Sequence, residues 1–156
     1  MKIEYLADHK DVIPTLARWT FEEWSYLWPE RTLSDVERLI SERCNKEHIP
    51  IALVAIDKGK VVGMIELKTS DFKARQNLSP WLAGLYVDKL QRSKGVGTKL
   101  VHEIENLAAR LGASKLYLFT DDAEKFYSKL GWCIQERMVW QSISVTVMEK
   151  DITRLR

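Results

Sequence analysis

An α+β domain, in which helices cover the faces of a mixed sheet of the α/β type, is the fold that this sequence predicts. The chain has 156 residues, the size of one ordinary domain, and 46% of them are apolar, as in proteins with a buried core. Apolar residues recur with a period of two in some segments and with helical spacing in others, in the order β-α-α-β-β-β-α-β-α-β-β. We therefore expect a single domain over residues 1–156.

The N-terminal part of the chain is predicted to contain one strand and two helices. A weak alternation of apolar and polar residues over Ile3–Leu6 is typical of a short strand. Apolar residues then follow helical spacing over Val12–Leu27, and Pro29 ends that pattern. A second helix is expected to begin near Ser34, because Ser34 and Glu37 have the spacing of a capping box.

Strands dominate the middle of the chain. The apolar range Ile51–Asp57 and the returning range Lys60–Ser70 flank the dipeptide Lys58-Gly59, which predicts a β-hairpin. A polar loop follows, and Trp81–Val87 is predicted to be a strand with large apolar side chains. Gly84 interrupts this strand, and a glycine in a strand often marks a bulge or a close approach of another group.

The last third of the chain alternates helices and strands. Its clearest helix is Gly95–Leu111, where apolar residues follow three-four spacing. The remaining elements are a strand, a short helix and two strands around a tight turn, over Lys115–Thr120, 121–130, Trp132–Trp140 and Ile143–Met148. Asp121 or Asp122 is expected to cap the short helix, because both are good N-cap residues.

Composition and charge exclude several classes of function. With 24 basic and 22 acidic residues the net charge is +2, and the sequence has no basic stripe of the kind that binds nucleic acid. No apolar run is long enough to span a bilayer and the first residues do not resemble a signal peptide, so we expect a cytoplasmic protein that does not bind membranes. Cys44 and Cys133 are the only cysteines and lack metal-binding spacing, so we expect neither a disulfide framework nor a metal site.

A basic loop with two glycines lies between the strand at 81–87 and the long helix. The first N–H groups of a helix have no partner within it, and the helix dipole adds partial positive charge, so this end binds phosphate well. Gly95 and Gly97 have no Cβ that would keep a phosphate away, while Arg92 and Lys94 add positive charge. The simpler alternative is a basic turn before an amphipathic helix.

The loop does not match two other phosphate-binding patterns. The Walker pattern, Gly-x-x-x-x-Gly-Lys-Ser/Thr, is absent. The dinucleotide-binding pattern, Gly-x-Gly-x-x-Gly, fails because Leu100 stands where the third glycine is required. The sequence instead contains Arg-x-x-Gly-x-Gly after a strand and at the start of a helix.

Two blocks of the sequence resemble the Gcn5-related N-acetyltransferase (GNAT) superfamily. Arg92–Gly97 is similar to that family's acyl-CoA pyrophosphate loop, and Ala123–Trp132 is similar to its Ala-x-x-Phe-Tyr-x-x-x-Gly-Phe segment. The resemblance implies the GNAT fold, acetyl-CoA as co-substrate and direct transfer of the acetyl group to an amine. Ser93 stands where many members have glycine, and Thr120 stands where many have an asparagine that contacts the cofactor.

The resemblance also implies roles for individual residues. The set expected to bind acyl-CoA is Leu85, Tyr86, Val87, Arg92, Ser93, Lys94, Gly95, Val96, Gly97, Thr98, Thr120, Phe126 and Tyr127. Tyr127 matches the general acid of the family, which protonates the departing thiolate. The alternative for Tyr127 is an aromatic ring that only packs against its neighbours.

The general base is less clearly marked in the sequence. An alkylamine has a pKa near ~10, so it must lose a proton before it attacks. Some members of the family have a glutamate on the strand that here begins at Trp81, but no acid occurs there. Glu66 on the preceding strand is therefore the expected catalytic base. The alternative for Glu66 is a solvated glutamate paired with Lys68 or another lysine. Glu22 and Glu23 on the first helix, or a chain of waters, are further options for the base.

The acceptor amine is expected to bind near the first helix. Trp24 and Trp28 are four residues apart and would share a helix face beside Glu22. Aromatic rings next to a carboxylate suit a cationic amine. Trp81 is a further candidate for the same site. The alternative for these tryptophans is packing in the core.

Two functions follow from these expectations. The first is an N-acetyltransferase for a primary amine, either a small molecule or a peptide N-terminus, that acts as a monomer or homodimer. The second is a catalytically weak domain that binds acyl-CoA for regulation or sensing. Tyr127 favours the enzyme, whereas the missing acid on the strand at 81–84 favours the sensor.

Overall fold

A seven-stranded sheet with four α-helices forms the fold in the computed structural model, which describes all 156 residues. The elements are β1 (Lys2–Tyr5), α1 (Ile13–Trp24), α2 (Leu33–Ser41), β2 (Ile51–Asp57), β3 (Lys60–Lys68), β4 (Trp81–Val87), α3 (Val96–Arg110), β5 (Lys115–Thr120), α4 (Glu124–Lys129), β6 (Cys133–Trp140) and β7 (Ile143–Asp151). The strand order is β1-β2-β3-β4-β5-β7-β6, with β4 and β5 parallel and β7 antiparallel to both neighbours. The predicted element order and mixed α+β sheet are confirmed.

The chain divides into two units. The first unit contains Met1–Glu66 and Gly84–Ile104, and the second contains Leu67–Ala83 and Glu105–Arg156. The boundaries fall within β3, β4 and α3, so each of these elements contributes residues to both units. The expectation of a single domain over residues 1–156 stays a prediction.

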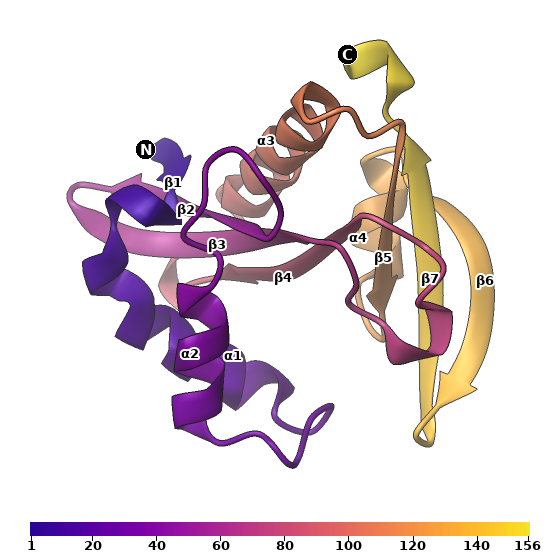
Figure 1. Ribbon diagram of the computed structural model, residues 1–156, viewed down its shortest axis with the longest axis horizontal. Helices are drawn as coiled ribbons and strands as arrows, with labels where there is room; N and C mark the ends of the chain where they lie inside the picture. The colour runs from indigo at the N-terminus through magenta and orange to yellow at the C-terminus, as the bar shows by residue number, and fades with distance from the viewer. The chain divides into compact units, whose positions relative to one another are not determined.

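In the first unit, α1 and α2 cover one face of β2 and β3 (Figure 1). The apolar residues of α1 follow helical spacing, so they form one stripe that turns toward the strands. The core on this face contains Leu16, Ala17, Ile40, Ala52, Val54, Met64 and Tyr86. Each of these side chains is buried, and their removal from water stabilises the unit.

The start of α3 lies on the opposite face of the same strands (Figure 1). Side chains alternate between the two faces of a strand, so Gly63 faces α3 while Met64 faces α1. A Cβ built at Gly63 would lie only 3.0 Å from Leu100 Cδ1 and 3.1 Å from the Tyr86 carbonyl oxygen. Glycine at position 63 therefore lets the first turns of α3 pack directly on β3.

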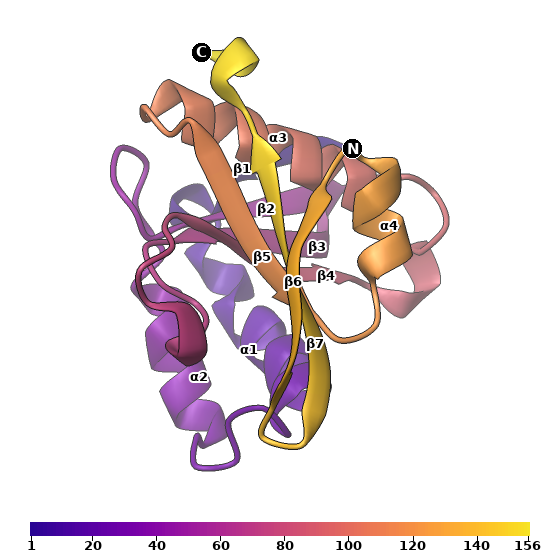
Figure 2. The same cartoon turned by 90° about the vertical axis from the view of Figure 1, so that its right-hand side faces the viewer.

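The second unit is built around β5, β6 and β7. Figure 2 shows β6 and β7 as a long hairpin with α4 beside it. An aromatic core lies on these strands, where the Phe72 ring stacks on Phe119 at 4.6 Å and meets Trp81 edge to face at 6.3 Å. Val145 and Val147 of β7 complete this core. Large aromatic rings thus make up much of this core, together with aliphatic residues of β7.

Both hairpin turns have the backbone that a tight two-residue turn requires. In the first unit, Lys58 and Gly59 have φ values of 52° and 78°. In the second unit, Gln141 and Ser142 have φ values of 49° and 64°. Two successive positive φ angles are typical of type I′ turns, whose twist matches that of the flanking strands. The hairpins predicted at these two positions are confirmed.

Two predicted helix boundaries are wrong. The first helix ends at Trp24 rather than Leu27, so Trp28 is not on it. The capping box at the start of α2 uses Thr32 and Asp35 instead of Ser34 and Glu37. None of the helices combines the length and the apolarity that crossing a membrane would require.

Thr32 provides a test of this cap. Its Oγ1 accepts a hydrogen bond from the Asp35 N–H at 3.1 Å, and the Asp35 carboxylate accepts one from the Thr32 N–H at 2.9 Å. We expect Thr32→Ala to lower the free energy of unfolding by about 1 kcal/mol, measured by urea denaturation. Ser34→Ala is the matched control, and we expect it to change stability by less than about 0.5 kcal/mol. If Ser34→Ala lowered the free energy of unfolding more than Thr32→Ala, Ser34 rather than Thr32 would be the capping residue.

Candidate active site

The loop that the sequence predicts as an anion site lies at the N-terminus of α3. Ser93 has a φ of 65° and Gly95 a φ of 82°, so the backbone turns sharply twice before the helix begins. The first donor within the helix is the Lys99 N–H, which bonds the Gly95 carbonyl at 3.1 Å. The N–H groups of residues 96–98 therefore precede the helical hydrogen bonds.

The charge at this helix start suits a phosphate. The first turn of α3 contains no acidic residue, and Arg92, Ser93, Lys94 and Gly95 are exposed to solvent. The helix dipole and the two cationic side chains all favour an anion here. The pyrophosphate of acyl-CoA therefore fits the residues present at this position.

Arg92 is anchored on β4. Its Nε–H donates to the Val87 carbonyl oxygen at 3.0 Å, and its guanidinium carbon lies 5.3 Å from the centre of the Tyr86 ring. That ring stacks on Trp19 at 5.1 Å and meets Trp24 edge to face at 6.3 Å. These contacts join the start of the loop to α1. They use only one guanidinium nitrogen of Arg92, so the others can bind an anion.

Tyr86 is one of the predicted cofactor residues, but its side chain faces α1. The side chain is buried, and desolvation raises the pKa of the phenol above its ordinary value. The negative charges of Glu23 and Glu22 raise this pKa further, whereas Arg92 lowers it. The phenol is therefore neutral at physiological pH and acts as an aromatic platform for Arg92.

Glu66 lies in a buried ion pair. Its Oε2 accepts from Arg43 Nε at 3.1 Å, and the two residues are 7% and 8% exposed. Arg43 also donates to the Leu39 carbonyl oxygen, near the end of α2. A Cβ built on Gly84 would lie 3.0 Å from Glu66 Oε1, and Gly84 has a φ of 60°. The expected irregularity of β4 at Gly84 therefore accommodates the Glu66 carboxylate, and Lys68 instead pairs with Asp71 at 2.7 Å.

The predicted base therefore has a structural partner that the sequence does not suggest. Protonation of Glu66 would remove the buried partner of Arg43 and leave only the longer contact, 3.6 Å, between Arg43 Nη1 and the exposed Glu42 carboxylate. A poorly compensated buried charge is unfavourable. The catalytic role of Glu66 stays a prediction, and the ion pair with Arg43 argues against it. Arg43 lies 23 residues before Glu66, so no local pattern could reveal the pairing.

The predicted acceptor residues are separated by the end of α1. Glu22 is exposed and Trp24 half-buried on the last turn of the helix, whereas Trp28 follows the helix and its N–H bonds the Ser25 carbonyl at 3.2 Å. Trp24 and Trp28 therefore do not share a helix face. The Arg31 guanidinium lies 4.6 Å above the Trp28 ring, so a cation of the protein already uses this ring.

Trp81 belongs to the core. It is completely buried, and its Nε1–H donates to the Leu78 carbonyl oxygen at 2.6 Å. It packs with Phe72, Val145 and other residues of the second unit. A ring with no exposed surface and a satisfied N–H has nothing left to offer a substrate, so we assign Trp81 to packing.

Three predicted cofactor residues lie in the second unit, close to α4. Thr120 Oγ1 accepts from the Ala123 N–H at 3.0 Å. Ala123 is the N-cap of α4 and makes no side-chain cap hydrogen bond, so the cap predicted at Asp121 or Asp122 is wrong. Phe126 is half-buried, and its ring lies 5.1 Å from the Tyr127 ring. The Tyr127 side chain is buried, and desolvation raises its pKa, with a further rise from the charge of Asp122.

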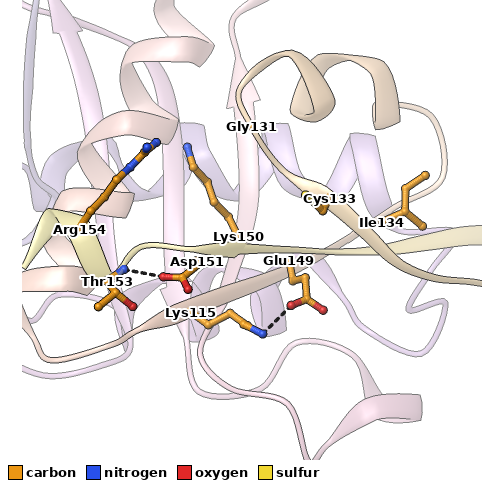
Figure 3. A pocket seen from close by; sticks show the side chains of 9 residues that line it. All are labelled: Lys115, Gly131, Cys133, Ile134, Glu149, Lys150, Asp151, Thr153 and Arg154. Carbon is orange, nitrogen blue, oxygen red and sulfur yellow. Dashed lines mark hydrogen bonds and ion pairs between the residues drawn. The ribbon is translucent and has the colours of Figure 1, made fainter.

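A cavity of about 690 Å³ lies elsewhere in the second unit (Figure 3). Its walls include Lys115, Cys133, Lys150 and Arg154, and none of the predicted site residues contributes to them. Lys115 and Glu149 form an ion pair of 2.7 Å on its wall. No group of three or more His, Cys, Asp or Glu side chains in the chain is arranged to hold a metal ion.

Comparison with known proteins identifies the family. A model of the acetyltransferase (GNAT) family matches residues 13–132. The chain is 24% identical over 144 residues to N-alpha-acetyltransferase 30 of Schizosaccharomyces pombe, covering 86% of this chain and 82% of that protein. It is 25% identical to an aminoglycoside 6'-acetyltransferase type Ii, with a TM-score of 0.75 over 97% of both chains.

Solved structures also match the fold. A structure of aminoglycoside 6'-N-acetyltransferase complexed with coenzyme A has a TM-score of 0.74 and 23% identity over 97% of both chains. The corresponding enzyme from Enterococcus faecium has a TM-score of 0.75 and 23% identity over the same shares. Since the family model spans most of the chain and the relatives transfer acetyl groups, this protein belongs to the GNAT acetyltransferase family and is an acetyl-CoA-dependent acyltransferase.

Proposed function

We propose that this enzyme transfers an acetyl group from acetyl-CoA to a primary amine, and that residues 92–98 bind the pyrophosphate of the co-substrate. The observation that supports the binding assignment is the start of α3, which presents N–H groups outside the helical hydrogen bonds and lacks acidic residues. Arg92 and Lys94 add the charge that a pyrophosphate requires.

The backbone of β4 is the proposed contact for pantetheine. Leu85 and Val87 alternate with Tyr86, so their side chains face away from α1. The Val87 carbonyl oxygen accepts a hydrogen bond from Arg92 Nε at 3.0 Å, which places this end of β4 next to the proposed pyrophosphate loop. An extended chain can pair with such a strand as an added strand would.

Tyr127 is the proposed general acid. In the transfer, the amine nitrogen bonds to the thioester carbonyl carbon and the carbon–sulfur bond breaks. The nitrogen gives up one proton to solvent and the departing thiolate takes up one, so the products are an amide and free CoA thiol. A buried phenol with a raised pKa keeps its proton at neutral pH, so Tyr127 can donate a hydrogen bond to the departing sulfur. Thr120 and Phe126 are the further proposed contacts for the co-substrate in the second unit.

The acceptor is proposed to bind beside the end of α1. Glu22 and Glu23 are exposed there, and Trp24 lies on the same turn. The names of two relatives, an N-alpha-acetyltransferase and an aminoglycoside 6'-N-acetyltransferase, both describe acetylation of an amine. Carboxylates near the site would attract the protonated amine, and desolvation would favour the neutral form that reacts.

Gly97→Trp tests the proposed pyrophosphate loop. We expect it to abolish detectable binding of CoA in calorimetry, because an indole at the start of α3 fills the space of the phosphate. His102→Trp, on an exposed position of the same helix, is the control and should bind CoA with unchanged affinity. Unchanged affinity of Gly97→Trp in a folded protein would remove the loop from the site.

Tyr127→Phe tests the proposed acid. We expect kcat to fall about 100-fold, the range that general acid catalysis contributes, while the affinity for CoA stays within about twofold. The ring and its packing remain, so the melting temperature should change little. A kcat equal to that of the parent enzyme would exclude Tyr127 as the acid.

A panel of amines tests the proposed reaction. We expect release of free thiol from acetyl-CoA with at least one peptide N-terminus or aminoglycoside, and the product should be an amide by mass spectrometry. An alkylamine has a pKa near ~10, so kcat/KM should rise with pH as the neutral amine becomes more abundant. Acetylation of hydroxyl groups alone would overturn the assignment of an amine acceptor.

A further inference from the structure

A buried ion pair that the proposed reaction does not use lies next to the C-terminal end of α4. Lys150 of β7 places its Nζ 3.0 Å and 3.1 Å from the two carboxylate oxygens of Glu105. Glu105 is 3% exposed, and the Lys150 side chain is 12% exposed. Removing two charges from water is unfavourable unless further hydrogen bonds satisfy them, so their other partners indicate what the pair does.

Those partners belong to the segment that follows Tyr127. Lys150 Nζ also donates to the Leu130 carbonyl oxygen at 2.8 Å, at the end of α4. Glu105 Oε2 accepts from Trp132 Nε1 at 3.0 Å. Figure 3 shows the Lys150 side chain leaving β7 on the side where Gly131 lies, and the Lys115–Glu149 pair on the opposite side.

Trp132 connects this pair to Tyr127. The backbone N–H of Trp132 donates to the Tyr127 carbonyl oxygen at 3.1 Å, and the two rings meet edge to face with centres 6.1 Å apart. The Trp132 indole ring cannot rotate without losing the hydrogen bond from its Nε1–H to Glu105. The Tyr127 ring therefore packs against a neighbour whose direction is set by a charged group.

The short α4 needs such support. It contains six residues, and a helix of this length is not stable by itself in water. At its start, the Glu124 carboxylate accepts from Arg137 Nη2 at 2.6 Å and from Thr146 Oγ1 at 2.9 Å. At its end, Lys150 places a positive charge where the helix dipole is negative. Tyr127 lies between these two attachments.

We propose that Glu105 and Lys150 are positioning residues for Tyr127, because their ion pair fixes both the end of α4 and the Trp132 ring against which Tyr127 packs. This inference rests on the proposed role of Tyr127 as the general acid. Neither residue contacts the reacting atoms in this scheme. They act through the direction of the phenol, and a small displacement of a catalytic group is enough to slow a reaction strongly.

Lys150→Met, which keeps the length of the side chain and removes the donor, tests the proposal. We expect kcat to fall about 10- to 100-fold, while KM for acetyl-CoA stays within about twofold. In the Tyr127→Phe background, the same change should lower kcat by less than about twofold, because the phenol that it positions is gone. Lys150→Arg, which retains a charged donor, should recover most of the activity.

Two further variants serve as a control and as a replacement if Lys150→Met does not fold. Lys115→Met removes the partner of Glu149 from the other side of the sheet and should leave kcat unchanged. If Lys150→Met does not fold because Glu105 is left unpaired, Glu105→Gln combined with Lys150→Met removes both charges and is measured in the same two backgrounds. Circular dichroism and the melting temperature show which variants are folded.

The kcat values of these variants distinguish a failure of the positioning role from a failure of Tyr127 as the acid. Equal losses of kcat with and without the Tyr127 hydroxyl would overturn the positioning role, because a general structural defect does not depend on that hydroxyl. An unchanged kcat for Lys150→Met in the parent enzyme would also overturn it. If Tyr127→Phe alone leaves kcat unchanged, the acid assignment fails and the positioning role fails with it.

Discussion

The close packing of α3 on β3 at Gly63 is the constraint on which the proposed co-substrate site depends. A side chain at position 63 would meet Leu100 and Val96 of the helix and the Tyr86 carbonyl oxygen of β4. Without one, the helix begins directly beside the strand, and its first N–H groups lie immediately after the sharp turns at Ser93 and Gly95. The proposed anion site thus depends first on the way the helix is packed, and the charges of Arg92 and Lys94 add to it.

The features that the sequence predicts correctly are those specified by neighbouring residues. The two hairpins are marked by a dipeptide between apolar strands, and α3 by apolar residues with helical spacing, among them Leu100, Ile104 and Leu107. The loop at Arg92–Gly97 is recognisable for the same reason, since its glycines and cations are adjacent in the chain. The order of elements could therefore be predicted almost completely, and boundary errors appear where two capping boxes compete, at Thr32 and Ser34.

The features that the sequence does not reveal depend on residues far apart in the chain. Arg43 and Glu66 are separated by 23 residues, and Glu105 and Lys150 by 45. For Arg43 no local pattern marks the pairing. Glu105 does have a signal, because it falls between Val101 and Ala108 on the buried stripe of α3, where an acid needs a buried partner. The identity of that partner still requires the fold.

Aromatic rings that the sequence suggests for substrate binding contact arginines of the protein itself in the folded structure. The cluster of tryptophans near the N-terminus suggests rings open to a cationic amine, but the Trp28 ring is covered by Arg31 at 4.6 Å and the Tyr86 ring by Arg92 at 5.3 Å. A substrate cation would have to displace an arginine from either ring, and guanidinium is itself a strong partner for aromatic faces. On the proposed acceptor side, discrimination therefore falls to the exposed carboxylates of Glu22 and Glu23. Such groups attract a protonated amine at long range, and the reaction itself still requires its neutral form.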